Sequence, residues 1–194
     1  SWAGLMFMGG ELNPRQAWQL YKQVATLAKV VDLIADQVAF LTPTLEIGGQ
    51  MVEGHEILDL LAKPGYNRTR RRLIKELVVE ILTSGAAYPH IIGNTGFMPV
   101  AIDLCKAQNL VNQEGDDGWP VSFLVSEPRR QMTFVRDGTR DFRFVDGQFG
   151  ELLPIYDMAG DYKGIGFSRL QAVRNDVELR LRCIVHNRQL IDKG

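Results

Sequence analysis

Residues 69–92, with the sequence TRRRLIKELVVEILTSGAAYPHII, contain the change of pattern that decides the fold class. Before Ser84-Gly85, apolar residues recur at three- and four-residue steps, which is the spacing of one face of a helix. Thr69 or Asn67 is placed to cap the start of this helix, and Ser84-Gly85 is typical of its end. Residues 87–92 are then a short apolar run typical of a buried strand. The stretch therefore predicts a helix that leads directly into a sheet.

The sequence before this stretch predicts one long N-terminal helix. Asn13-Pro14 is a favourable start, because Asn caps helices and Pro suits the first helical position. The helix should end before Thr42-Pro43, because the residue ahead of a proline avoids helical angles. The helix has one continuous apolar face, at Leu20, Val24, Leu27, Val31, Ile34, Val38 and Leu41. The same spacing suits packing in a core or on a neighbouring subunit, and we favour the core.

Two smaller elements separate this long helix from the next one. Leu45–Ile47 and Met51-Val52 flank Gly48-Gly49, and this arrangement predicts a short hairpin. Residues 55–61 predict a short helix that Pro64-Gly65 ends. The chain should therefore have two shorter helices after the long one, here and over the residues that follow Thr69.

Beyond the first strand the chain has the period of strands rather than helices. The further candidate strands are residues 100–104, 121–125, 132–135, 142–145 and 152–156. Asp137-Gly138 and Asp146-Gly147 are turn signals between them. Helices followed by a run of strands predict an α+β fold with mostly antiparallel strands, rather than an alternating parallel sheet.

The last residues predict a long helix that leads out of the domain. Gly164-Ile165-Gly166-Phe167-Ser168 forms a turn in which Ser168 can cap the helix. The apolar positions of the helix share one face, at Leu170, Val173, Val177, Leu181 and Ile184. We expect a division into an α+β domain over residues 1–163 and an outgoing helix over 164–194, with further structure after it.

Composition places the chain among ordinary globular proteins. The formal net charge of -1 argues against a surface devoted to phosphate binding, although a local basic patch is compatible with it. Cys105 and Cys183 are too few for a disulfide framework, and we expect two buried or half-buried thiols, as in a reducing compartment. No run is apolar enough to predict a membrane span.

Motifs for catalysis are weak or absent in the sequence. His55, His90 and His186 are far apart and lack metal-ligand spacing, and we find no serine elbow or phosphate loop. We therefore predict no catalytic residue, no metal and no cofactor. Gly164-x-Gly166 before a helix suggests a nucleotide-binding enzyme domain as a minor alternative, but Arg169 occupies the position of the third glycine of that motif.

Two groups of charged residues are candidate contact sites. The first is basic, at Arg68, Arg70, Arg71, Arg72 and Lys75, with Arg129 and Arg130 as a second patch. It suits an anionic partner, but a solvated face with pairing to Glu76 explains it more simply. The second group lies on the last helix, at Arg174, Asp176, Glu178, Arg180 and Arg182. Asp176–Arg180 and Glu178–Arg182 can pair within the helix, or the same charges can pair between adjacent copies of it.

Taken in order, these landmarks resemble the HK97-type portal proteins of tailed phages, which form a ring at one vertex of the head. The matching residues are Val31, Ile34, Ala35 and Thr42-Pro43, residues 55–61 with Lys63-Pro64-Gly65-Tyr66-Asn67, residues 82–88, residues 164–170, and the closing residues 187–194. Two departures occur. Arg169 stands where the family commonly has proline, and the usual Pro-Asn is extended to residues 64–67.

The resemblance implies a structural role without catalysis. Residues 1–163 would be a wing-like domain and residues 164–194 the start of the stem helix. The whole protein would form a homo-oligomeric ring, a dodecamer, through which double-stranded DNA is packaged and ejected. Its implied partners are the terminase large subunit, the major capsid protein and a head-tail adaptor, with no membrane. It would reside in the virion, and in the host cytoplasm during assembly. The alternative is another head-assembly or adaptor protein.

Overall fold

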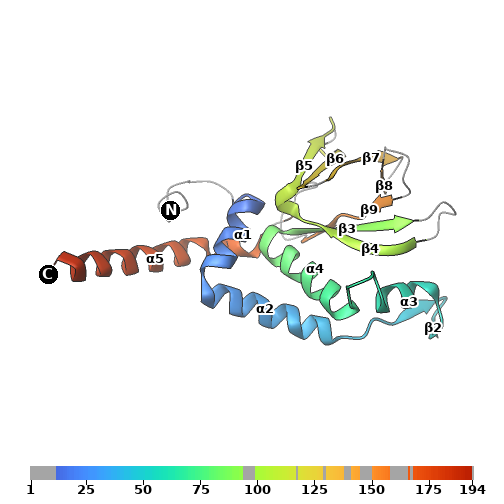
Figure 1. The fold of residues 1–194 in the computed structure, drawn as a ribbon, viewed down its shortest axis with the longest axis horizontal. Helices are drawn as coiled ribbons and strands as arrows, with labels where there is room; N and C mark the ends of the chain where they lie inside the picture. The colour runs from blue at the N-terminus through green and yellow to red at the C-terminus, as the bar shows by residue number, and fades with distance from the viewer. Residues whose placement is uncertain are drawn as a thin grey trace.

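The computed structural model describes residues 12–93, 99–116, 118–128, 130–137, 141–144, 150–157, 166 and 168–193. Within them, helices precede a large antiparallel sheet, and one long helix closes the chain (Figure 1). The predicted α+β class and the C-terminal helix are confirmed. The sheet lies on one side of α4 and α2 on the other, while α1 stands at the end of α4 from which β3 begins (Figure 1).

The predicted single N-terminal helix is wrong, because two helices occupy its place. α1 spans Pro14–Gln23 and α2 spans Ala25–Phe40, with Val24 between them in extended conformation at φ -103° and ψ 97°. The physical reason is packing: α1 buries Ala17 and Leu20, α2 buries a separate stripe, and the turn at Val24 lets both faces reach α4.

The small elements between α2 and α4 follow the prediction. α2 ends at Phe40, and β1 (Leu45–Ile47) and β2 (Gln50–Val52) form an antiparallel hairpin. Gly48 and Gly49 have φ values of +60° and +83°, which side chains disfavour, so the glycine pair fits this turn. α3 spans Glu56–Ala62, and the His55 ring accepts a hydrogen bond from the amide of Ile57.

The transition from helix to sheet is confirmed. α4 spans Arg70–Ser84, and Thr69, rather than Asn67, caps it by accepting a hydrogen bond from the Arg72 amide at 3.3 Å. Gly85 ends the helix with φ +78°, in the left-handed region where glycine is favoured. β3 (Ala86–Gly93) begins at the next residue.

The large sheet is antiparallel at each pairing among the described strands. Its order is β10-β3-β9-β8-β7-β6-β5, and β4 pairs with the other side of β3. The remaining elements are β4 (Pro99–Cys105), the short 3-10 helix η2 (Ala107–Asn109), β5 (Leu110–Glu114), β6 (Pro120–Glu127), β7 (Arg130–Asp137), β8 (Asp141–Phe144), β9 (Gly150–Leu152) and β10 (Ile155–Tyr156).

Two features of the sheet differ from the sequence prediction. β5 was not predicted, and the strand predicted over residues 152–156 is two strands, β9 and β10, separated by Leu153-Pro154. Proline has no amide hydrogen to donate to a neighbouring strand, which explains the interruption. Gly138 and the Asp146-Gly147 turn lie outside the described residues.

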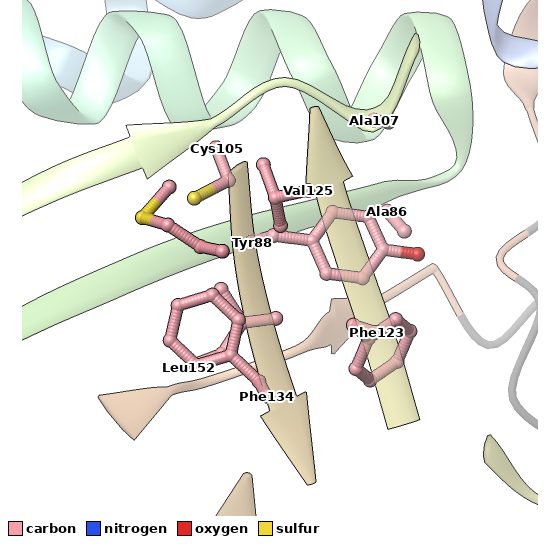
Figure 2. Close-up of a cluster of buried hydrophobic side chains, with 9 residues drawn as sticks. Ala86, Tyr88, Cys105, Ala107, Phe123, Val125, Phe134 and Leu152 are labelled. Carbon is pink, nitrogen blue, oxygen red and sulfur yellow. The ribbon is translucent and has the colours of Figure 1, made fainter. Parts of the chain in front are cut away.

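The core consists of two clusters on opposite sides of α4. Tyr88 from β3 packs edge-on against Phe123 from β6 within the sheet cluster, at 5.5 Å between ring centres (Figure 2). The helical cluster contains Ala17, Val31, Ala35, Val79 and Leu170. Leu170 belongs to the last helix, so this cluster also anchors the start of that helix to the domain.

The last helix, α5 (Arg169–Lys193), extends away from the rest of the molecule (Figure 1). On its apolar face, side chains beyond the first turns are open to solvent: Ile184 is 62% exposed and Ile191 79%. The helix thus leads out of the domain, as predicted, with an apolar stripe that the described residues do not cover.

Candidate functional site

The junction where α5 leaves the domain is built on a close backbone contact. A Cβ placed on Gly166 would lie 1.6 Å from the carbonyl oxygen of Gly85, so no side chain fits there. The same carbonyl accepts a hydrogen bond from the Asp157 amide at 2.8 Å. The end of α4, the strand β10 and the approach to α5 therefore meet at Gly85.

Side chains lock the same junction. The Ser168 hydroxyl donates to the carbonyl of Thr83, and its oxygen accepts from the Leu170 amide at 3.2 Å, which confirms the predicted cap of α5. The Arg169 guanidinium binds both carboxylate oxygens of Asp157. Arg169 thus ties α5 to the end of β10.

The described part of the Gly164-x-Gly166 turn is packed against protein. Gly166 lies against Gly85, and the Ser168 hydroxyl oxygen accepts the hydrogen bond of the Leu170 amide. Gly164, Ile165 and Phe167 lie outside the described residues. Close packing against α4 therefore explains the second glycine, whereas the sequence suggested only a tight turn.

Acidic side chains from several elements neutralise most of the predicted basic run. Arg68 pairs with Glu76 at 3.0 Å and with Asp103 of β4 at 2.7 Å. Arg72 also pairs with Glu76, at 2.8 Å. The predicted pairing to Glu76 is present, and β4 contributes a partner that the sequence did not indicate.

The next turn of the run pairs with α2. The Lys75 ammonium lies 2.8 Å from Asp36, and this hydrogen bond raises the pKa of Lys75 and lowers that of Asp36. Arg71 lies 3.7 Å from Asp36 and over the ring of Phe40, at 3.9 Å from its centre. These contacts hold α2 against α4, so the run acts as a clamp between helices.

The remaining residues of the predicted basic patches are dispersed. Arg70 is half-buried at the first position of α4, and among the described residues it has no ion pair. Arg129 lies outside the described residues, and Arg130 is exposed on β7. Arg130 and the α4 run therefore lie on different elements, the sheet and a helix.

The candidate charges on α5 fall into two environments. Arg174 is 8% exposed and lies where α5 meets the domain. Asp176, Arg180 and Arg182 are exposed further along, whereas the side chain of Glu178 is not described. Among the described side chains, Asp176 and Arg180 form no ion pair with each other, so both are open to another chain.

Sequence reasoning missed a cavity of about 520 Å³ beside α4. Its lining includes Trp18 and Tyr21 from α1, Glu80 from α4, and Lys106 from the segment after β4. Burial raises the pKa of Glu80 to about 7, and its carboxylate accepts from the Ala107 amide at 3.4 Å. The Trp18 indole N–H is buried and has no hydrogen-bond partner among the described residues. No local motif marks this site, because Glu80 shows only as one position of an amphipathic helix.

Cysteines and histidines occupy unrelated positions. Cys105 is buried in the sheet, but Cys183 is exposed on α5, so the expectation of two buried or half-buried thiols is wrong for Cys183. Its helix face is uncovered, which explains the difference. His55 caps α3, His90 is buried and His186 is exposed. Within the described ranges, no three His, Cys, Asp or Glu side chains group in a way that suits a metal ion.

None of the helices in the described part of the chain is both long enough and apolar enough to span a membrane.

Comparison with solved structures finds chains of gene transfer agent (GTA) particles. A chain of the neck of an empty GTA particle, computed with C6 symmetry, matches 97% of this chain and 49% of its own length, with a TM-score of 0.74 and 20% identity. A neck chain of the native particle, computed with C12 symmetry, matches 99% and 49%, with a TM-score of 0.70 and 21% identity.

A third chain, from the virion of the native GTA particle, matches 96% of this chain and 47% of its own length, with a TM-score of 0.69 and 20% identity. This chain therefore shares its fold with components of such particles and spans about half of their length. No family model matches the sequence, and no curated protein does.

Proposed function

We propose that this chain is the wing and the beginning of the stem of a portal subunit, in a phage or prophage head. The observation that carries the proposal is the match of 97% of this chain to part of a GTA neck chain at a TM-score of 0.74. The ordered motifs that resemble HK97-type portal proteins support it independently. In this proposal residues 1–163 form the wing and residues 164–194 start the stem.

The proposed protein acts as a ring at the capsid vertex. Double-stranded DNA passes through the ring during packaging and ejection, and the terminase large subunit, the major capsid protein and a head-tail adaptor dock on it. The ring has no catalysis of its own. C6 and C12 symmetry were used to compute the matched necks, which supports a dodecamer for this protein as well.

The junction at Gly85 and Gly166 suits this role. A helix that projects from a domain can brace a ring only if its angle to the domain is fixed. The backbone contact of Gly166, the Ser168 cap and the Arg169–Asp157 pair fix the first turn of α5 at three points. We therefore assign this junction the task of aiming the stem helix.

Electron microscopy of the full-length protein tests the proposal. We expect closed rings with a central channel in negative stain and, with co-expressed major capsid protein, one ring at a single vertex of each shell. A full-length protein that stays monomeric at all concentrations contradicts it.

A second candidate is a head-assembly or adaptor protein, and the descriptions of the matched chains favour it in one respect: they name the neck and the virion without naming a portal. Rings that bind finished heads but never enter shells during co-assembly would favour this alternative.

A further inference from the structure

The outer face of α2 is apolar and uncovered. Val30, Leu33 and Ile34 are 51%, 62% and 43% exposed, on the side of the helix opposite the stripe that packs on α4. Single exposed apolar side chains are common, but adjacent ones on one helix face mark an interaction surface. Lys29 is exposed one turn before Leu33, so the face has a cationic border.

The segment over residues 44–62, which contains the hairpin β1–β2 and α3, is poorly anchored in its own chain. The main contacts of the hairpin are between its own two strands, and α3 has no buried residue. A lone two-stranded hairpin is marginally stable in water. Ile47, Met51 and Ile57 nevertheless expose 53%, 65% and 49% of their surface. α3 packs against β4, but these three side chains stay exposed among the described residues.

The two surfaces carry opposite charge. Residues 44–62 contain four acidic residues and no lysine or arginine; the acids are Glu46, Glu53, Glu56 and Asp59. On the outer face of α2, Lys29 is exposed and lacks an ion pair among the described residues, whereas Lys22 of α1 lies over the Trp18 ring, 5.2 Å from its centre. The acids of α2 are already paired: Asp36 with Lys75 at 2.8 Å, and Asp32 with the same ammonium at 3.7 Å. The free charge of α1 and α2 is therefore positive.

The hairpin does not cover α2 of its own chain. It follows the C-terminal end of α2 and lies beyond it rather than folding back along the helix (Figure 1). We propose that the outer face of α2 receives residues 44–62 of a second copy of this chain. This inference rests on the proposed function, because it assigns one contact between neighbouring subunits of the ring. Two different surfaces meet, so the contact is heterologous and repeats around a closed ring.

Cysteine cross-linking in the full-length protein tests this contact. Leu33→Cys and Met51→Cys are introduced together into the full-length protein. Cys183, and any cysteine that the full-length protein has beyond these 194 residues, are first replaced by serine. Cys105 can remain, since burial raises the pKa of its thiol to about 12 and keeps it unreactive. A short bismaleimide is added to assembled protein, and the products are resolved by denaturing electrophoresis. We expect a ladder of covalent dimers and higher multimers.

Single-cysteine variants provide matched controls. Leu33→Cys alone and Met51→Cys alone should give no covalent dimer. Rings assembled from a mixture of the two single variants should give dimers only, because each subunit then has one introduced cysteine. Met51→Cys with Val111→Cys should give none, although Val111 on β5 is as exposed as Leu33, at 59% against 62%.

The outcomes separate the contact from the proposed function. Rings whose Leu33→Cys, Met51→Cys subunits stay uncross-linked overturn the contact and leave the ring intact. Dimers from Leu33→Cys alone overturn it as well, because they require the same face on both copies. If the full-length protein without these substitutions forms no ring, both the contact and the portal proposal are overturned.

Discussion

Helices α4 and α5 have the same kind of apolar pattern but different surroundings. In α4, Leu73 is 1% exposed, and the sheet and the two N-terminal helices enclose the helix. In α5, Ile184 on the apolar face is 62% exposed, and the start of the helix is the part packed in the core. The difference teaches that an amphipathic pattern predicts a face to be covered without specifying whether the same chain covers it.

Residues on the apolar faces of the two helices give the largest predicted difference. Leu73→Ala should cost about 4 kcal/mol of unfolding free energy in this chain, because it leaves a cavity in the core. Ile184→Ala should change it by less than about 0.5 kcal/mol, as at an exposed position. Urea denaturation of both variants measures the two costs. Similar costs would mean that this chain itself covers α5, which would contradict the difference between the two helices.

The boundary between the two regions is tested at Gly166. Gly166→Ala should destabilise the chain by about 3 kcal/mol, since the new Cβ meets the carbonyl of Gly85 and the backbone must shift. Gly54→Ala is the matched control, because among the described residues, apart from its two neighbours in the chain, none has an atom within 4 Å of its Cβ position. Thermal unfolding should show a lower melting temperature for Gly166→Ala alone, and equal melting temperatures would disprove the close contact.

A pH titration sharpens the account of α4. The folded pKa of Glu80, about 7, lies above the value of 4.5 expected when unfolded. Between these values the folded protein binds a proton that the unfolded chain has lost, so stability falls as the pH rises, by about 3 kcal/mol in all. Glu80→Gln cannot titrate and should flatten this part of the stability curve. Parallel curves for the two proteins would show that Glu80 titrates alike in both states.

The smallest expected effect is that of the ion pair that attaches α5. Arg169→Met should cost about 1 kcal/mol, because the Arg169 side chain is 53% exposed and solvent screens its pair with Asp157. The cost should shrink in 1 M salt, where the screening length is only about 3 Å. Urea denaturation at low and high salt measures it. A cost that salt leaves unchanged would indicate lost packing instead of lost charge.

Local pattern predicted those elements whose ends carry specific residues. Thr69, Gly85 and Gly48-Gly49 each set a backbone conformation, and the helix and hairpin that they delimit are present. The break at Val24 has no such residue, since valine is common in helices, and packing on α4 produces it. β5 has little apolar alternation, and its pairing with β6 defines it.

The candidate site was predicted less well than the fold, because its contacts join distant parts of the chain. The sequence marks Gly166 as a turn residue but cannot indicate Gly85 as the backbone against which it packs. The basic run was visible, yet its partners Asp36 and Asp103 come from α2 and β4. Ser168 was predicted correctly because a cap depends on residues adjacent in sequence.

Hydrogen exchange tests the central claim, that α5 and residues 44–62 are covered by other parts of the assembly while the enclosed core of the domain is complete in this chain. Amide exchange is measured by mass spectrometry on the 194-residue chain and on the assembled full-length protein. The account predicts that peptides from α4 exchange equally slowly in both, whereas peptides from α5 and residues 44–62 slow markedly in the assembly. Equal exchange of α5 in the two samples would contradict it.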